Sequence, residues 1–192
     1  METLGCAQII CSDKTGTLTK NEMTATNIYT TTGDFVVSGL GYAPEGEIIL
    51  ENTGADFNHP ALYRLIQSSD LCNEADVFLD GKTWVPQGAP TEAALKTLSR
   101  KAGYVDTGAM KIDDIPFDSQ YKYRAALFHV DGKKILFANG APEKLINICG
   151  KQTTLEGTEP IDPVFWESRI EAAAARGQRL LGCAFAEVSD DK

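Results

Sequence analysis

Long apolar segments are missing from this 192-residue sequence. No run approaches the roughly 18 apolar residues of a membrane-spanning helix, and residues 1–4 lack the basic and apolar regions of a signal peptide. Apolar residues make up 43% of the chain and charged residues 23%, which is typical of globular proteins. We therefore expect a soluble, monomeric piece that holds one large domain, or one domain and a fragment.

Paired cysteines and basic clusters are missing as well. The five cysteines, at positions 6, 11, 72, 149 and 183, show no C-x-x-C spacing, which favours reduced thiols over a zinc site. The net charge is −9 and no basic stripe is visible, so a nucleic-acid partner is excluded. ATP is compatible with this charge, because a pocket can be locally basic in an acidic protein.

The pattern of apolar residues and turns predicts a mixed α/β (α+β) fold. We expect an antiparallel β-sheet of about six or seven strands flanked by helices. Asp80-Gly81 and Asp131-Gly132 lie between apolar runs and predict hairpins. The last expected helix can be capped by Asp162, has Pro163 in its first turn and can end at Gly177. The expected strands are 24–32, 35–37, 77–79, 83–85, 110–116, 122–130, 133–138 and 179–188; the expected helices are 59–71, 90–98, 142–150 and 163–177; residues 39–57 are expected to form a loop.

A short apolar run, residues 7–11, leads to Ser12 and Asp13 and then to the polar residues 14–17. The run predicts a buried strand, and open α/β sheets place reactive groups at the carboxyl ends of their strands. A carboxylate there can attack phosphorus and form an aspartyl phosphate, while a lysine, hydroxyls and a flexible backbone suit a phosphoryl group. From a short D-x-T-G pattern alone, a polar turn with Asp13 as a helix cap is equally consistent.

Residues 13–19, with the sequence DKTGTLT, resemble the phosphorylation motif of P-type ATPases at all seven positions. The resemblance implies that Asp13 accepts the γ-phosphoryl group of ATP and that Lys14 neutralises charge. It also implies that Thr15 helps to place phosphate and Mg²⁺, with Asp13 and Thr15 beside the metal. Related phosphatases carry a second aspartate at the position of Thr15, so a longer-lived phosphoenzyme is expected here.

Four further residues resemble the nucleotide pocket of the same family. Glu92, in the segment GAPTE, matches the glutamate that approaches the adenine amino group, and Phe117 matches the phenylalanine that stacks on adenine. Lys122 matches a lysine that lines the pocket, and Arg179 matches an arginine that reaches the ribose and phosphates. Taken singly, Phe117 is also consistent with a core residue, and Glu92 and Arg179 with surface charges.

One position departs from the family pattern. The usual K-G-A-P-E reads Asn139-Gly140-Ala141-Pro142-Glu143 here, and the missing lysine normally borders the adenine site. An asparagine can still form hydrogen bonds but carries no charge. We therefore expect Asn139 and Gly140 at the nucleotide site, with weaker binding than in a lysine-containing relative.

The resemblance implies a fragment of a phosphorylation domain of the haloacid-dehalogenase-like type at residues 1–20 and a nucleotide-binding domain at 21–192. The motifs G-D-G-x-N-D and T-G-E-S are absent. We expect an ATP-binding, Mg²⁺-dependent region on the cytoplasmic side of a membrane, from a pump that transports a cation, with calcium the expected ion. Its partners would be the rest of the phosphorylation domain, the actuator domain and the membrane helices, and the isolated chain is expected to be inactive. The alternatives are a freestanding phosphatase and a non-catalytic nucleotide-binding module.

Overall fold

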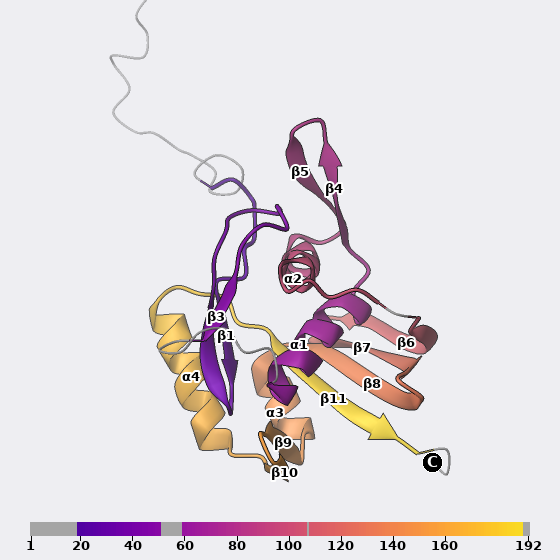
Figure 1. Cartoon of the computed structure of the whole chain (residues 1–192). Coiled ribbons are helices and arrows are strands. Elements are labelled where there is room, and N and C mark those ends of the chain that lie inside the picture. Colours follow the sequence, from indigo (N-terminus) through magenta and orange to yellow (C-terminus); the bar gives the residue numbers. More distant parts are fainter. Residues whose placement is uncertain (1–18, 51–58, 107, 190–192) are drawn as a thin grey trace, which may run out of the picture.

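The computed structural model describes residues 19–50, 59–106 and 108–189. Within these residues it contains four helices and eleven strands, and the mixed α/β fold class is confirmed (Figure 1). The helices are α1 (Pro60–Leu71), α2 (Pro90–Lys101), α3 (Pro142–Ile148) and α4 (Pro163–Ala175). The strands are β1 (Asn27–Thr30), β2 (Gly33–Val37), β3 (Ile48–Leu50), β4 (Asp76–Asp80), β5 (Thr83–Gln87), β6 (Met110–Asp118), β7 (Tyr123–Val130), β8 (Lys133–Gly140), β9 (Lys151–Thr154), β10 (Gly157–Pro160) and β11 (Gly182–Val188).

The described strands are divided among four antiparallel sheets, where the sequence analysis expected one sheet of six or seven strands. One sheet has the order β1-β2-β3, a second has the order β11-β8-β7-β6, and β4-β5 and β9-β10 are separate hairpins. Helix α1 lies between the three-stranded and four-stranded sheets, and the β4-β5 hairpin projects beyond α2 (Figure 1). The strands therefore remain antiparallel, but the helices between them prevent a single continuous sheet.

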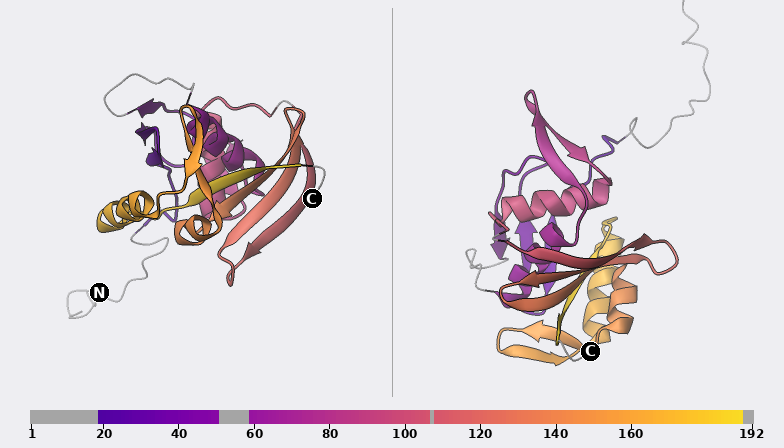
Figure 2. Two further views of the ribbon diagram at one scale, coloured as in Figure 1. Left: turned by 90° about the horizontal axis from the view of Figure 1, so that it is seen from below. Right: turned by 90° about the vertical axis from the view of Figure 1, so that its right-hand side faces the viewer.

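Helix α1 contributes to two hydrophobic cores. Leu62 and Ile66 pack with Phe35 and other residues of the three-stranded sheet, whereas Leu71 packs with Phe137 and its neighbours in the four-stranded sheet. Figure 2 (right) shows α1 and α2 on one side of the four-stranded sheet and α3 on the other. Because α1 belongs to both cores, its position fixes the two sheets relative to each other.

Local sequence signals account for most element boundaries. All four described helices have a proline in their first turn, where its missing N–H is not needed. Asp131 and Gly132 have φ values of 54° and 73°, so this two-residue turn has the left-handed conformation that suits a tight hairpin. The predicted hairpin between β7 and β8 is confirmed.

Two elements were not predicted. Strand β3 lies inside the expected loop 39–57, and the β9-β10 hairpin follows α3. β3 has only three residues and pairs with β2, while β10 contains Pro160 and is exposed throughout. Both elements depend on pairing with a neighbouring strand, which a local apolar pattern does not reveal.

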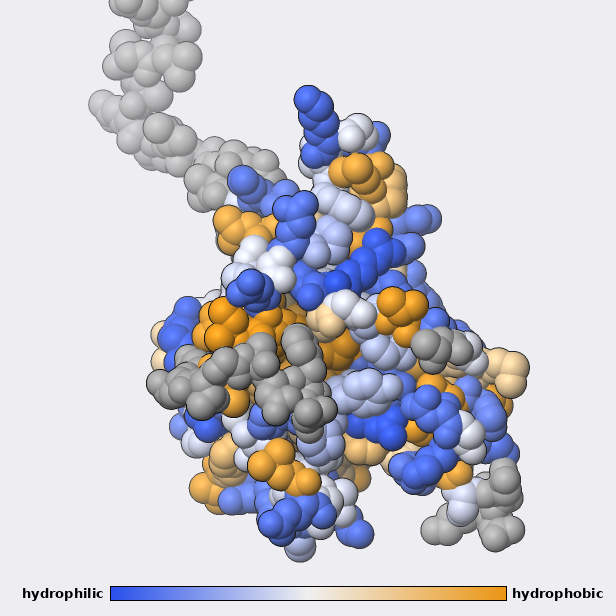
Figure 3. All heavy atoms as spheres, in the orientation of Figure 1, coloured by the Kyte–Doolittle hydropathy of each residue, from blue (hydrophilic) through white to orange (hydrophobic). Residues whose placement is uncertain are grey.

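The surface is mixed. On the face in Figure 3, apolar side chains form separate groups among polar ones. Exposed apolar residues include several on the edge strand β6, such as Met110, Ile112 and Ile115. No helix in the described part of the chain is long and apolar enough to cross a bilayer.

The cap of α4 gives a direct test of the sequence-based boundaries. Asp162 Oδ1 accepts a hydrogen bond from the backbone N–H of Phe165 at 3.1 Å. Replacing Asp162 with Ala removes this bond and should lower the free energy of unfolding by about 1 kcal/mol, measured by urea denaturation. Glu171→Ala, an exposed change in the same helix, should alter it by less than about 0.5 kcal/mol. Equal effects of the two changes would contradict the assigned cap.

Candidate functional site

Four strands meet in one row at an end of the four-stranded sheet. Gly182 of β11 lies opposite Gly140 of β8, and Gly140 lies opposite Tyr123 of β7. Tyr123 lies in turn opposite Asp118 of β6. Opposite residues of antiparallel strands are about 4.5–5.5 Å apart at Cα, so side chains next to this row lie close together. We call this row of four residues the sheet end.

Phe117 is next to Asp118 at the sheet end, and its residue surface is 61% exposed. The pairing of β6 with β7 shifts register between Ile115 and Asp118, and a shift of this kind turns a side chain away from the regular face of the sheet. The ring is therefore not a core residue. An exposed aromatic face of this kind can stack on a planar base.

Lys122 is held in an unusual backbone conformation one residue before the sheet end. Its φ is 61°, and its N–H donates to the carbonyl oxygen of Asp118 at 2.7 Å. Its own carbonyl oxygen accepts from the N–H of Ala141 at 2.8 Å. Because its backbone is fixed on both sides and its side chain is exposed, the ammonium group can reach a ligand at this end.

Gly140 allows the strands to approach closely. A Cβ built on Gly140 would lie 2.4 Å from the carbonyl oxygen of Lys122 and 2.4 Å from Cβ of Tyr123. Gly182, opposite it, would bring a Cβ to 2.9 Å from Leu145 of α3. A glycine is therefore required by packing at position 140, a residue that the sequence analysis expected at the nucleotide site.

Glu92 joins the sheet end from the first turn of α2. Its Oε1 accepts a hydrogen bond from Nη1 of Arg124 at 2.5 Å, and its side chain is 23% exposed. Its carbonyl oxygen accepts from Nδ2 of Asn73 at 2.8 Å. Glu92 thus lies beside β7 with part of its carboxylate reachable from solvent.

Asn139 is placed differently from the expectation that it borders the adenine site. Its residue surface is only 5% exposed, and its Oδ1 accepts from Oγ of Ser68 at 2.7 Å. Its Nδ2 donates to the carbonyl oxygens of Ser68 and Cys72 at 3.1 and 3.0 Å. The amide satisfies carbonyl groups at the end of α1, so in this structure Asn139 links β8 to the helix.

Arg179 lies in the connection between α4 and β11 and is exposed. It precedes Gly182 by three residues, a separation of at most about 10 Å along the chain. Its guanidinium is therefore within reach of the sheet end, next to β11, which is the opposite edge strand of the sheet from the β6 strand that carries Phe117. This spacing suits a ligand that extends across the strands.

Asp13, Lys14 and Thr15 lie outside the described residues. In the described part of the chain, no group of three or more His, Cys, Asp or Glu residues could hold a metal ion. The described cysteines, Cys72, Cys149 and Cys183, are free thiols, and burial raises the pKa of Cys72 to about 11.

Arg124 is a residue of this region that the sequence analysis missed. It lies opposite Asn139 and is 4% exposed. Its Nη2 donates to Oε1 of Glu74 at 2.9 Å, in addition to its bond with Glu92. The sequence contained a signal for this: Arg124 is at the same alternating positions of a mostly apolar strand as the buried residues Ala126 and Phe128.

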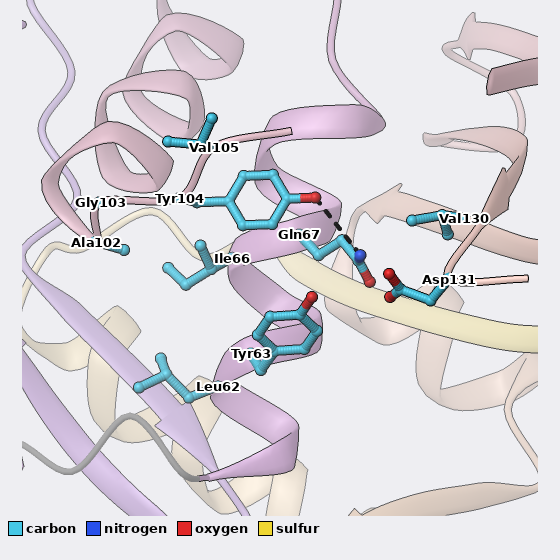
Figure 4. Close-up of a pocket in the computed structure, with 10 residues that line it drawn as sticks. All are labelled: Leu62, Tyr63, Ile66, Gln67, Ala102, Gly103, Tyr104, Val105, Val130 and Asp131. Atoms are coloured by element: carbon cyan, nitrogen blue, oxygen red, sulfur yellow. Dashed lines mark hydrogen bonds between the residues drawn. The ribbon is translucent and has the colours of Figure 1, made fainter. Parts of the chain in front are cut away.

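A separate cavity of about 260 Å³ lies near the other end of β7 (Figure 4). Tyr63 and Tyr104 line it together with Gln67, whose Nε2 donates to Tyr104 Oη at 3.5 Å. Val130 at its edge is six residues from Arg124, which is about 20 Å along a strand. Its lining includes the carboxylate of Asp131 but no lysine or arginine, so it suits a phosphate-bearing ligand less well than the sheet end.

Comparison with known proteins identifies the family of the chain. Residues 61–192 match the family model described as P-type ATPase, cytoplasmic domain N. The chain belongs to the P-type ATPase family.

Several relatives match most of the chain. The cation-transporting ATPase pma1 of Synechocystis sp. is 36% identical over 195 residues, which are 96% of this chain and 21% of the relative. The calcium-transporting ATPase type 2C member 1 of Homo sapiens is 36% identical over 196 residues, with the same two shares. The calcium-transporting ATPase of Bacillus subtilis is 38% identical over 76% of this chain and 17% of its own length. The chain thus spans about a fifth of these P-type ATPases.

Gly140 provides a test of the packing at the sheet end. We expect Gly140→Ala to lower the free energy of unfolding by about 1–3 kcal/mol, because the added methyl group overlaps the backbone of β7. Gly150→Ala is the matched control, since a Cβ there meets nothing within 4 Å. Chemical denaturation of both variants measures the difference, and a Gly140→Ala variant as stable as Gly150→Ala would contradict the assigned register.

Proposed function

We propose that this chain is the ATP-binding region of a cation-transporting P-type ATPase and that adenine binds at the sheet end. The observation that supports the proposal is that an exposed ring and an exposed ammonium are on residues next to the sheet end, while a solvent-reachable carboxylate is bonded to Arg124 beside it. Phe117, Lys122 and Glu92 come from β6, the β6–β7 turn and α2. An aromatic face, a cation and an acceptor for the amino group are the groups that an adenine nucleotide requires.

The proposed orientation runs across the strands. The base would stack on Phe117 with its amino group toward Glu92, and the phosphates would extend toward the exposed Arg179 beyond β11. A guanidinium binds phosphate oxygens in a bidentate manner, which suits this position. Asn139 would support the site through α1, because its amide is already fully engaged there.

The phosphoryl-transfer role concerns residues 1–20, which we propose as part of a phosphorylation domain, with residues 21–192 as the nucleotide-binding domain. Asp13 would be the nucleophile and Lys14 the neutralising cation, while Asp13 and Thr15 would hold Mg²⁺. Bound Mg²⁺ would neutralise phosphate charge. Two of the relatives named above are calcium-transporting ATPases, which supports calcium as the cation. The description of the family model as a cytoplasmic domain supports a location on the cytoplasmic side of a membrane. The actuator domain, the rest of the phosphorylation domain and the membrane helices would be its partners.

Phe117 tests the proposed base site. We expect Phe117→Ala to weaken binding of ATP and AMP equally, by about 1–3 kcal/mol each, because both ligands lose the same stacking contact. Isothermal titration calorimetry with both nucleotides measures the effect. Phe78→Ala removes an exposed ring from β4 and serves as a control that should leave both affinities unchanged. Unchanged ATP affinity in Phe117→Ala would contradict the proposal that adenine binds at the sheet end.

Arg179 tests the direction of the phosphates. We expect Arg179→Ala to weaken ATP by about 1–2 kcal/mol and to leave adenosine nearly unaffected, because only ATP presents phosphate oxygens. The difference should shrink at high salt. Arg176→Ala is the matched control, since the Arg176 guanidinium already bonds Tyr29 and Gln178. Equal losses for ATP and adenosine in titrations of Arg179→Ala would show that Arg179 does not contact phosphate.

A further inference from the structure

Arg124 carries a buried positive charge beside the proposed base site. Its side chain is 5% exposed, and it extends from β7 toward Glu92 of α2 and Glu74 in the connection between α1 and β4. Burial alone would lower the pKa of Arg124, but hydrogen bonds and charge from Glu92 and then Glu74 raise it overall. The guanidinium is therefore permanently charged in the folded protein.

The register gives this charge a specific place. Arg124 of β7 lies directly opposite Asn139 of β8, so both side chains are on the face of the sheet that α1 covers. Asn139 is the position at which the uncharged amide replaces the lysine of the family pattern. Arg124 therefore supplies a positive charge on β7, opposite the position on β8 where the lysine of the family pattern is replaced by Asn139.

Arg124 forms a hydrogen bond with only one of the two carboxylate oxygens of Glu92. Nη1 bonds Oε1 of Glu92 at 2.5 Å, and Oε1 is the only oxygen of that carboxylate that accepts a hydrogen bond from a described residue. Because the Glu92 side chain is 23% exposed, its second oxygen can accept from an incoming N–H donor. The arrangement fixes the direction of the carboxylate and leaves one acceptor open.

The packing of the fold does not require this charge. Nε of Arg124 is buried without a hydrogen-bond partner among the described residues, which is unfavourable for folding. Apolar residues such as Ala126 and Phe128 occupy the equivalent alternate positions of β7. Replacing a buried charge by an apolar side chain of similar size is often neutral or stabilising. Both carboxylate partners can reach water, so neither would be left buried and unpaired.

We propose that Arg124 is a positioning residue that sets the base selectivity of the nucleotide site, by orienting Glu92 to accept a hydrogen bond from an exocyclic amino group. This inference rests on the proposed adenine site. An adenine base donates from its amino group to the open oxygen of Glu92. A hypoxanthine base presents a carbonyl oxygen at the same position, which the fixed carboxylate repels. The orientation supplied by Arg124 therefore discriminates between the two bases.

The experiment compares ATP with ITP, which differ at this position of the base. Dissociation constants for both nucleotides are measured by calorimetry on the full chain and on Arg124→Met. We expect the wild type to prefer ATP and the preference to fall by about three- to tenfold in Arg124→Met, while the thermal unfolding midpoint is unchanged or higher. Arg100→Met is the matched control, because Arg100 bonds Asp76 and Val77 at the other end of α2; its preference should equal that of the wild type.

A double variant tests whether Arg124 acts through Glu92. Adding Arg124→Met to Glu92→Gln should not change the ATP-to-ITP ratio further, because the carboxylate that Arg124 orients is already absent. Arg124→Lys, which cannot bridge two carboxylates with a planar fork, should lower the preference at least about threefold, and it decides the question if Arg124→Met does not fold.

The possible failures are distinguishable. A wild-type chain that binds neither ATP nor AMP would overturn the proposed function. Wild-type binding of ATP with the same ATP-to-ITP ratio in folded Arg124→Met, or in Arg124→Lys where the methionine variant does not fold, would overturn the role of Arg124 alone. Equal losses for both nucleotides with a lower unfolding midpoint would show that Arg124 is only structural.

Discussion

A closed set of polar contacts holds the sheet end to the helices, and the candidate site depends on it. Asn139 bonds the last turn of α1, and Asn73 beyond that turn bonds the carbonyl oxygen of Glu92. Glu92 bonds Arg124, which lies opposite Asn139. Polar networks of this kind hold their side chains in one arrangement when each member has a partner. The network holds the first turn of α2 and orients the carboxylate of Glu92 beside β7.

The network also explains how an acidic chain can offer a nucleotide site. The overall charge of −9 opposes phosphate, but the groups near the sheet end are not uniformly acidic. Arg124 partly offsets the carboxylates of Glu92 and Glu74, and the exposed cations Lys122 and Arg179 are within a few residues of the sheet end. Local charge and not net charge governs a small ligand at short range. The cavity beside Tyr104 lacks such cations and lies about 20 Å along β7.

Signals that act within a few residues were sufficient to predict most of the fold. The Asp131-Gly132 turn, the proline-led helices and the cap at Asp162 all depend on local geometry and are confirmed. The pairing of β3, the β9-β10 hairpin and the division into four sheets depend on contacts between distant segments, which local patterns do not encode. In the site, exposed Phe117 was predictable from the motif. The burial of Asn139 and its pairing with Arg124 follow from strand register, which becomes visible only when β7, β8 and α1 are placed together.

The most direct test of the account is a residue-resolved map of where ATP binds. Titrating ATP into isotopically labelled chain and following amide signals by NMR reports every contact region at once. The account predicts the largest shifts at Glu92, at residues 117–124 and 139–140, and at residues 179–182, with little change at Tyr63 and Tyr104. Shifts concentrated at those two tyrosines, or the absence of saturable shifts, would contradict a nucleotide site at the sheet end.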